Sequence, residues 1–300
     1  METVLVTGGL GRSGRWLVDR LEGEYRVVCV DRDHPGHETP GRGTITFRAA
    51  ELTDAGETFD LLSAIDPDAV VHWAAIPADR RHAPGRVCDT NTDAAFNVLS
   101  AAGRVGARVV QASSEAAYGF FFAEETPLPD FLPVTEDHPL RPEDPYGTSK
   151  QVAENVGAMI ARRDDVPVAS IRPSWIQYPG SYAVRGDAYR EHRSMGAGDY
   201  WSYVDVRDVA DLVAAALAGG KEGAFEGHEA FNCHAAENAL GEPTLELLTD
   251  FFGDVPDDAE LDGEQSAFST VKAADLLDWK PAHSWRTAAD EEVPSPSLTR

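Results

Sequence analysis

The chain begins with the stretch Thr3-Val4-Leu5-Val6-Thr7-Gly8-Gly9-Leu10-Gly11-Arg12-Ser13-Gly14, in which a short apolar run leads directly into a glycine-rich turn. A helical pattern of apolar residues then continues to position 21. The order of strand, glycine-rich turn and helix is typical of a phosphate-binding unit, because a helix N-terminus attracts a phosphate. In such a turn Gly8 allows the tight bend, Gly11 lets a pyrophosphate approach the backbone, and Gly14 lets the helix pack against the strand. A βα turn without a ligand is the alternative.

The rest of the chain alternates apolar strands with helical patterns, which predicts a sheet of parallel strands with helices on both faces. The further strands are expected at Tyr25–Val30, Ile45–Phe47, Ala69–Ala75, Val109–Ala112, Val166–Ile171 and Ala230–Cys233. We therefore expect an α/β fold of the Rossmann type, a doubly wound parallel sheet, with a small C-terminal α/β substrate lobe. The expected division is a dinucleotide-binding domain over residues 1–172, which also receives approximately 203–235, and an interleaved substrate lobe over 173–300.

The residues after the strands indicate how a dinucleotide would lie. Asp31 ends the second strand, where a carboxylate meets the adenosine ribose hydroxyls and repels a 2′-phosphate, so NAD is favoured over NADP. Arg32 and Arg12 keep NADP as an alternative, since either guanidinium would pair with a 2′-phosphate if Asp31 turned away. Glu51-Leu52 is expected at the adenine edge, and the small residues that end the run Ala69–Ala75 allow the ribose and phosphates to lie close.

The stretch Tyr146-Gly147-Thr148-Ser149-Lys150 places a tyrosine and a lysine four residues apart at the start of an expected helix. Side chains at i and i+4 share one helical face, so the ammonium is expected near the phenol. A free tyrosine has a pKa of about 10, and a nearby positive charge favours the phenolate. The pair therefore indicates a proton-transfer site; a helix-start tyrosine with a solvated lysine is the alternative. Ser113-Ser114, after the fifth strand, offers a hydroxyl that would hold a substrate oxygen near Tyr146.

Taken together, these motifs resemble the extended short-chain dehydrogenase/reductase family of NAD-dependent sugar epimerases, dehydratases and dehydrogenases. The matching stretches follow in family order: Thr7 to Gly14, Asp31, His72-Trp73-Ala74-Ala75, Ser113-Ser114 before Tyr118-Gly119, Pro145 to Lys150, Ile171-Arg172-Pro173 and Tyr203 to Ala210.

The resemblance implies that Ser114 orients the substrate, that Tyr146 is the general acid/base, and that Lys150 binds the nicotinamide ribose and lowers the tyrosine pKa. It also implies the cofactor-binding residues Gly8, Gly11, Arg12, Ser13, Gly14, Asp31, Arg32, Glu51, Leu52, Trp73, Ala74, Ala75, Asn91, Ser113, Tyr146, Lys150 and Pro173. Glu115 stands where dehydratases of the family carry Asp, but the Glu that follows it there is Ala116 here, which weakens a dehydratase interpretation.

The segment after Pro173 is expected to bind the substrate. Trp175, Arg185 and Arg193 are the candidates besides Ser114 and Glu115, because rings stack on sugar faces and guanidinium groups bind anions. This segment looks short beside that of nucleotide-sugar epimerases. We therefore expect a dehydrogenase of a sugar, sugar acid or sugar phosphate. The alternatives are a nucleotide-sugar 4-epimerase of the UDP-glucose type and a dinucleotide-binding sensor without turnover.

The segment 120–144 lies between the two motif-bearing halves and carries Phe120-Phe121-Phe122. A connection this long beside a site is expected to serve as a lid or a pocket wall, with a packed surface turn as the alternative.

The amino-acid composition indicates which kinds of binding partner the protein is not expected to have. The 300 residues contain 51 acidic and 26 basic side chains, a net charge of −25, which offers no basic footprint for nucleic acid. Three separated cysteines and no clustered His or Cys predict neither a disulfide nor a metal site. No run of apolar residues is long enough for a membrane span and no signal-peptide pattern begins the chain, so a cytoplasmic protein is expected. The resemblance implies a homodimer.

The acidic charge, with four lysines in the whole chain, is typical of proteins from a high-salt cytoplasm. We expect the folded circular-dichroism signal to be lost when salt is lowered to the millimolar range, because the carboxylates then repel one another unscreened. A chain that keeps its fold in dilute buffer would contradict this halophilic interpretation.

Overall fold

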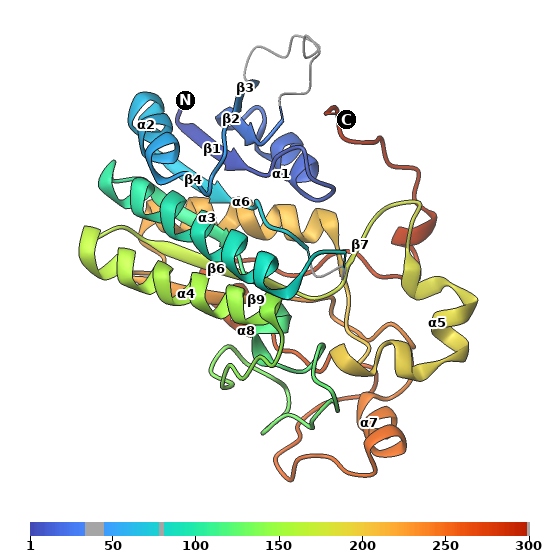
Figure 1. The fold of residues 1–300 in the computed structure, drawn as a ribbon. Helices are drawn as coiled ribbons and strands as arrows, with labels where there is room; N and C mark the ends of the chain where they lie inside the picture. Colours follow the sequence, from blue (N-terminus) through green and yellow to red (C-terminus); the bar gives the residue numbers. More distant parts are fainter. Residues whose placement is uncertain (34–44, 78–80, 299–300) are drawn as a thin grey trace.

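The computed structural model describes residues 1–33, 45–77 and 81–298 (Figure 1). Within these residues, seven strands form one parallel sheet in the order β3-β2-β1-β4-β5-β6-β9. They are β1 Thr3–Thr7, β2 Arg26–Asp31, β3 Ile45–Ala49, β4 Ala69–His72, β5 Arg108–Ala112, β6 Val168–Pro173 and β9 His228–Cys233. The central strands β4 and β6 are buried along their whole length, as parallel strands covered on both faces are. The predicted doubly wound sheet is confirmed.

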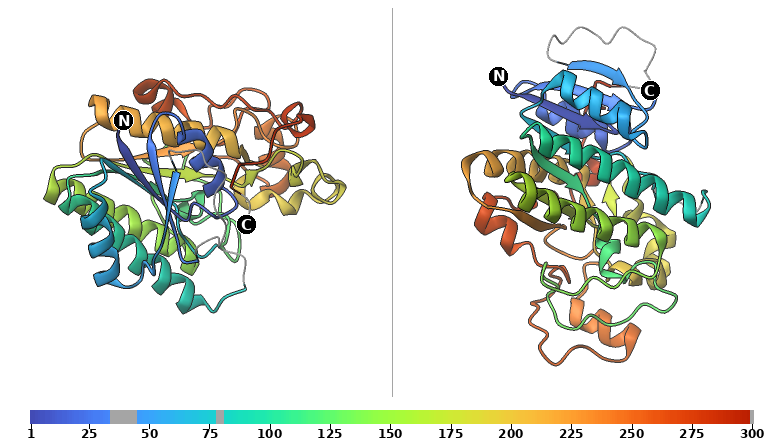
Figure 2. Two further views of the ribbon diagram at one scale, coloured as in Figure 1. Left: turned by 90° about the horizontal axis from the view of Figure 1, so that it is seen from above. Right: turned by 60° about the vertical axis from the view of Figure 1, so that its left-hand side comes forward.

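Two layers of helices cover the sheet (Figure 2). One face carries α2 Ala55–Ile65, α3 Pro84–Arg104 and α4 Pro145–Asp164, and the other carries α1 Gly14–Leu21, α6 Val206–Glu222 and α8 Val271–Leu277. Leu62, Val98 and Ile160 pack the first layer onto the strands. Leu17, Leu212 and Ala273 do the same on the opposite face. Burial of these apolar stripes is the main contribution that holds the helices against the sheet.

A third hydrophobic cluster lies outside these two layers, around Tyr200, Trp201 and Phe268. Its residues come from three separate parts of the chain, between 118 and 140, 175 and 203, and 235 and 289. The short elements here are β7 Ile176–Gln177, β8 Val204–Asp205, α5 Asp187–Glu191, α7 Thr244–Phe252 and the 3-10 turns Glu115–Tyr118, Ala183–Arg185, Arg193–Met195, Ala197–Asp199 and Ala288–Asp290. β7 and β8 form a separate parallel pair.

The largest difference from a predicted strand end is in β4. It ends at His72 rather than at Ala75, because the Thr7 hydroxyl oxygen accepts hydrogen bonds from the N–H groups of the next two residues, at 3.1 and 3.2 Å. Helix α3 begins at Pro84, since proline suits a first helical turn whose N–H groups have no partner. The tail after Ala288 is held against α1: Ser297 bonds the Asp19 carboxylate, and Leu298 is buried.

Candidate active site

Two adjoining cavities of about 660 and 700 Å³ lie at the carboxyl ends of the strands. Both are lined by Asp31, Ala74, Ala75 and Pro77, so together they form one elongated cleft. The first continues along the glycine-rich turn to Tyr146, and the second continues to the N-terminal half of α3. A cleft of this position and length fits a dinucleotide, because parallel sheets bind such ligands where their strands end.

The glycine-rich turn has no room for side chains. A Cβ atom on Gly14 would lie 2.1 Å from the Gly8 carbonyl oxygen. Gly8 itself has φ +67°, and a Cβ there would lie 2.7 Å from the backbone of Ala74. The turn therefore packs backbone against backbone, and without side chains at these positions a ligand can approach it closely.

The Asp31 carboxylate is fixed in the orientation that favours NAD. It accepts hydrogen bonds from the backbone N–H groups of Leu10, at 3.1 Å, and Arg32, at 2.9 Å. The Arg12 guanidinium is stacked 3.8 Å above the Tyr178 ring and donates to Ser181, so it is already engaged. Asp31 thus remains at the junction of the two cavities, where its charge opposes a 2′-phosphate.

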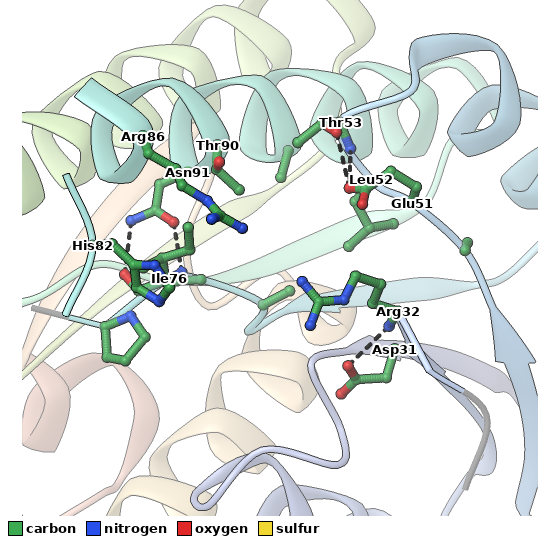
Figure 3. Close-up of a pocket in the computed structure, with 15 residues that line it drawn as sticks. Asp31, Arg32, Glu51, Leu52, Thr53, Ile76, His82, Arg86, Thr90 and Asn91 are labelled. Atoms are coloured by element: carbon green, nitrogen blue, oxygen red, sulfur yellow. Dashed lines mark hydrogen bonds between the residues drawn. The ribbon is translucent and has the colours of Figure 1, made fainter. Parts of the chain in front are cut away.

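Figure 3 shows the larger cavity, and the predicted cofactor-binding residues Arg32, Glu51, Leu52 and Asn91 are among those that line it. The Asn91 amide is not free for a ligand, since it bonds both backbone groups of Ile76, at 2.7 and 3.1 Å. Asn91 therefore fixes the segment after β4. The predicted set lacks several lining residues: Thr53, His82, Arg86 and Thr90 here, and Ile176 and Tyr178 in the other cavity. Their positions depend on how distant segments pack, and no local motif marks them.

The narrower cavity brings together Gly11, Ser13, Trp73, Ser113 and Pro173, all predicted to hold the cofactor. The Trp73 indole N–H donates to the Ser13 hydroxyl oxygen at 3.0 Å, which ties the glycine-rich turn to the segment after β4. Tyr146 and Lys150 close the inner end of this cavity.

Tyr146 and Lys150 lie together at that inner end, as their spacing predicts, and Ser114 is close to Tyr146. The Lys150 ammonium lies 5.4 Å from the centre of the Tyr146 ring and donates to the Ala112 carbonyl oxygen at 2.8 Å. The Ser114 hydroxyl lies close enough to Tyr146 to favour its phenolate and so to lower the tyrosine pKa. The Asp144 side chain caps α4 by accepting hydrogen bonds from the N–H groups of Tyr146 and Gly147, both at 2.9 Å. This cap fixes where the helix begins and therefore where Tyr146 lies.

The expected lowering of the Tyr146 pKa is wrong for the protein without bound cofactor or substrate. Burial raises the pKa of Tyr146 to about 12, and the Ser114 hydrogen bond only partly opposes this. Burial also lowers the pKa of Lys150 to about 8, although the Glu154 carboxylate favours its charged form. The ammonium and phenol are adjacent, but low-polarity surroundings disfavour charge on both groups.

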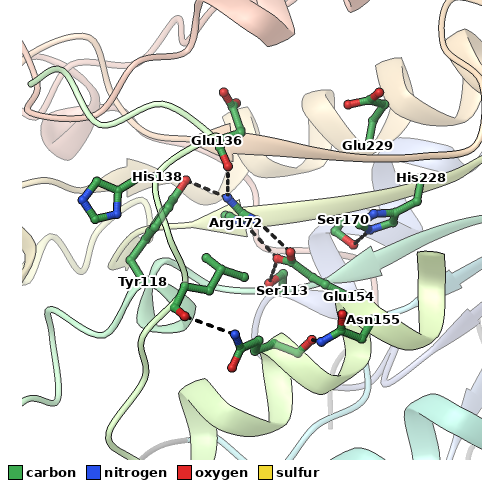
Figure 4. A network of polar contacts seen from close by, with 12 residues as sticks. Ser113, Tyr118, Glu136, His138, Glu154, Asn155, Ser170, Arg172, His228 and Glu229 are labelled. Atoms are coloured by element: carbon green, nitrogen blue, oxygen red, sulfur yellow. Dashed lines mark hydrogen bonds and ion pairs between the residues drawn. The ribbon is translucent and has the colours of Figure 1, made fainter. Parts of the chain in front are cut away.

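A buried ion pair behind the site was not predicted (Figure 4). Arg172 holds the Glu154 carboxylate through two bonds, at 2.9 and 2.7 Å, and also donates to the Tyr118 hydroxyl at 2.8 Å. The Ser113 hydroxyl donates to Glu154 at 2.5 Å. Glu154 stands one helical turn beyond Lys150, and that i, i+4 spacing is the signal that would have found it.

The predicted substrate-binding residues do not all lie in the same part of the structure. Glu115 is buried beside Ser114, and Trp175 lies half-buried with its ring 5.7 Å from that of Tyr189. Arg185 and Arg193 are not brought to the cleft. Arg185 pairs with Asp290 at the surface, and Arg193 pairs with Glu242 and Asp250.

The segment 120–144 is packed against the rest of the protein, and none of its residues lines the two cavities of the cleft. Phe120, Leu132 and Val134 are buried in the third hydrophobic cluster, and the Phe122 ring stands edge-on to Tyr146, 6.4 Å away. Among the residues that the structure describes, no group of His, Cys, Asp or Glu is placed to hold a metal ion. None of the described helices has the length and apolar character needed to cross a membrane.

Comparison with known proteins agrees with this geometry. A model of the NAD dependent epimerase/dehydratase family matches residues 4–233, which confirms the predicted resemblance. A UDP-glucose 4-epimerase of Streptococcus mutans is 34% identical over 51% of this chain and 45% of its own length. The UDP-glucose 4-epimerase of Lactobacillus helveticus is 26% identical over 93% of this chain and 92% of its own length. A crystal structure of a UDP-galactose 4-epimerase has 26% identity and a TM-score of 0.68, with 96% of both chains covered.

The lowered pKa of Lys150 predicts a pH-dependent stability. In the folded protein this lysine loses its proton near pH 8, whereas a lysine with the ordinary pKa of 10.5 keeps it. Between these values the unfolded chain binds more protons, so folding becomes more favourable as pH rises, by about 3 kcal/mol at most. Lys150→Met removes the group, and the stability of wild type relative to this variant is expected to increase between pH 8 and 10.5.

The measurement is the free energy of unfolding from urea titrations in high-salt buffer at pH 7, 9 and 10.5. Lys280→Met, at an exposed lysine, is the matched control and is expected to show no such change relative to wild type. A difference between wild type and Lys150→Met that stays constant over this interval would show that Lys150 keeps its ordinary pKa.

Proposed function

Because the chain belongs to the NAD dependent epimerase/dehydratase family, we propose that it is a dehydrogenase that oxidises a hydroxyl group of a sugar. In this proposal Ser114 holds the reacting oxygen, Tyr146 takes its proton, and the Lys150 ammonium stabilises the phenolate that this transfer requires. NAD supplies the hydride acceptor at the nicotinamide C4 and a positive charge on that ring. The cofactor-lining residues named above would hold it, and the fixed Asp31 supports NAD rather than NADP.

The observation that carries the proposal is that Tyr146 and Lys150 lie together at the inner end of a dinucleotide-sized cleft, with Ser114 close to Tyr146. A sensor that only binds dinucleotide has no need of a proton-transfer set. The raised pKa of Tyr146 is compatible with this role, because a phenol that releases its proton reluctantly in the protein alone avoids unproductive ionisation before the ligands bind.

Dehydrogenase chemistry on a small sugar is supported by the arginines between Pro173 and Tyr203. Arg185 and Arg193 are ion-paired with acidic side chains, and Arg190 is stacked on the Trp285 ring at 4.2 Å. A nucleotide sugar carries a diphosphate that usually needs such a guanidinium partner. A nucleotide-sugar 4-epimerase is the second candidate, since the relatives named above are UDP-glucose and UDP-galactose 4-epimerases.

We further propose a cytoplasmic, salt-dependent homodimer, with the division into residues 1–172 and 173–300 described from the sequence. Helices α3 and α4 lie side by side along one face (Figure 1), and Phe96 on α3 is 47% exposed, which supports this face as the subunit contact.

The test is the absorbance of reduced nicotinamide with purified protein, NAD, and a panel of free sugars, uronic acids, sugar phosphates and UDP-sugars in high-salt buffer. We expect more than one NADH per protein chain with a non-nucleotide sugar. Tyr146→Phe is expected to lower kcat by several orders of magnitude with an unchanged Kd for NAD, because the ring and its packing stay while the proton carrier is removed.

Two other outcomes are informative. No NADH with any sugar, together with C4 inversion of a UDP-sugar, would establish the epimerase instead. If Tyr146→Phe kept its NAD affinity and left every cellular role of the protein intact, the sensor without turnover would be the better description.

A further inference from the structure

The position of Ser114 is set by a short segment, residues 113–118, that leaves strand β5. The Ser114 hydroxyl oxygen accepts a hydrogen bond from the Ala116 N–H at 3.2 Å, which caps the 3-10 turn that follows. This turn packs on the first turn of α4, because a Cβ on Gly147 would lie 2.4 Å from the Ala116 carbonyl oxygen. Tyr146 directly precedes Gly147, so the position of the turn decides how Ser114 lies relative to Tyr146.

Both ends of the segment 113–118 are bound to one buried ion pair (Figure 4). At the first end, the Ser113 hydroxyl donates to the Glu154 carboxylate at 2.5 Å. At the other end, the Tyr118 hydroxyl oxygen accepts a hydrogen bond from Arg172 at 2.8 Å. Arg172 and Glu154 are joined by two hydrogen bonds of their own, at 2.9 and 2.7 Å. The serine proposed to hold the substrate therefore lies between two anchors that share one support.

The hydrogen bonds of this ion pair leave it a single arrangement. Both side chains are buried. Arg172 also donates to the Glu136 carbonyl oxygen at 3.1 Å, so that all three of its guanidinium nitrogens are bonded. The Tyr118 hydroxyl in turn donates to Asn232 at 2.8 Å. A buried polar network whose members are satisfied in this way is rigid, and it fixes the groups that are bonded to it.

The same ion pair is connected to the helix that carries Tyr146. Glu154 lies on α4 about two turns after Tyr146, and Arg172 lies on β6. The backbone also joins the segment to β6, since the Ser113 N–H donates to the Ile171 carbonyl oxygen at 2.8 Å. The helix of the tyrosine and the segment of the serine are thus placed relative to the same two side chains.

We infer that the Glu154–Arg172 pair positions Ser114 for proton transfer. It acts through the hydroxyl groups at the two ends of the segment 113–118, which keep Ser114 where it and Tyr146 contact the same substrate oxygen. The inference rests on the proposed function, in which both of these residues act on that oxygen. Since the ion pair is buried behind the site and is not expected to touch the substrate, its contribution is to the rate of the reaction.

The test uses Ser113→Ala and Tyr118→Phe, which each remove one anchor and leave the ion pair in place. Both variants are expected to lower kcat about tenfold or more, because a shift of about 1 Å in a catalytic group can cost that much. The Kd for NAD, from calorimetric titration in high-salt buffer, is expected to stay as in wild type, since both hydroxyls are bonded within the protein. This combination distinguishes positioning from cofactor binding.

Hydrogen–deuterium exchange of peptides that contain residues 113–118 provides a readout without sugar or turnover. In the wild-type protein the N–H groups of Ala117 and Gly119 are bonded to the carbonyl oxygens of Ser114 and Ala116, both at 3.1 Å. Exchange at these positions is expected to be about tenfold faster in both anchor variants, because a turn with one free end opens more often.

Ser202→Ala and Tyr203→Phe are the matched controls. Each makes the same chemical change at a fully buried residue whose hydroxyl is hydrogen-bonded, but outside the segment 113–118. Both controls are expected to keep the wild-type kcat and the wild-type exchange of the segment. Thermal unfolding shows which variants are folded, and either anchor variant provides the test if the other is not.

Three results would overturn the inference: a kcat in both anchor variants no lower than in the controls, unchanged exchange of the segment in both, or a loss of NAD affinity as large as the loss of kcat. Failure of the proposed function looks different, because the wild-type protein would then release no NADH with any sugar. If it inverts C4 of a UDP-sugar instead, a lower inversion rate in the anchor variants supports the inference, and an unchanged rate contradicts it.

Discussion

The hydrogen bond from the Lys150 ammonium to the Ala112 carbonyl oxygen, 2.8 Å long, joins helix α4 to the end of strand β5. The contact fixes Tyr146, one turn earlier on the same helix, beside the Ser113-Ser114 segment that leaves β5. Glu154, one turn later, continues this connection through Arg172 into β6. The proton-transfer geometry therefore depends on a buried lysine whose charge is costly to keep, and the protein compensates with one carbonyl and one nearby carboxylate.

Polar groups are distributed unevenly around this centre. On the cofactor side, the Asp31 carboxylate accepts two backbone N–H groups, and Arg12 and Asn91 are engaged with the protein. On the substrate side, Arg185 and Arg193 are paired with acidic side chains at the surface. These guanidinium groups therefore stabilise the surrounding structure.

Local spacing explains which features could be predicted from the sequence. The glycine-rich turn, Asp31 and the Tyr146–Lys150 pair depend on neighbours within a few residues, and the structure places them as expected. The surface pairing of Arg185 and the backbone bonds of Asn91 depend on segments that are apart in the chain. The expected lowering of the Tyr146 pKa is wrong for a related reason, because burial of the phenol raises this pKa more than Ser114 lowers it.

The most direct measurement follows the hydrogen itself. A sugar that the protein oxidises, deuterated at the carbinol carbon, is incubated with NAD, and the reduced cofactor is examined by mass spectrometry. Direct transfer at the Ser114–Tyr146 site predicts one deuterium in each NADH released into solution. When Tyr146 is replaced by Phe, almost no NADH is expected in the same time. Reduced cofactor without deuterium, or deuterium returned to the sugar with no NADH released, would contradict the proposed dehydrogenase.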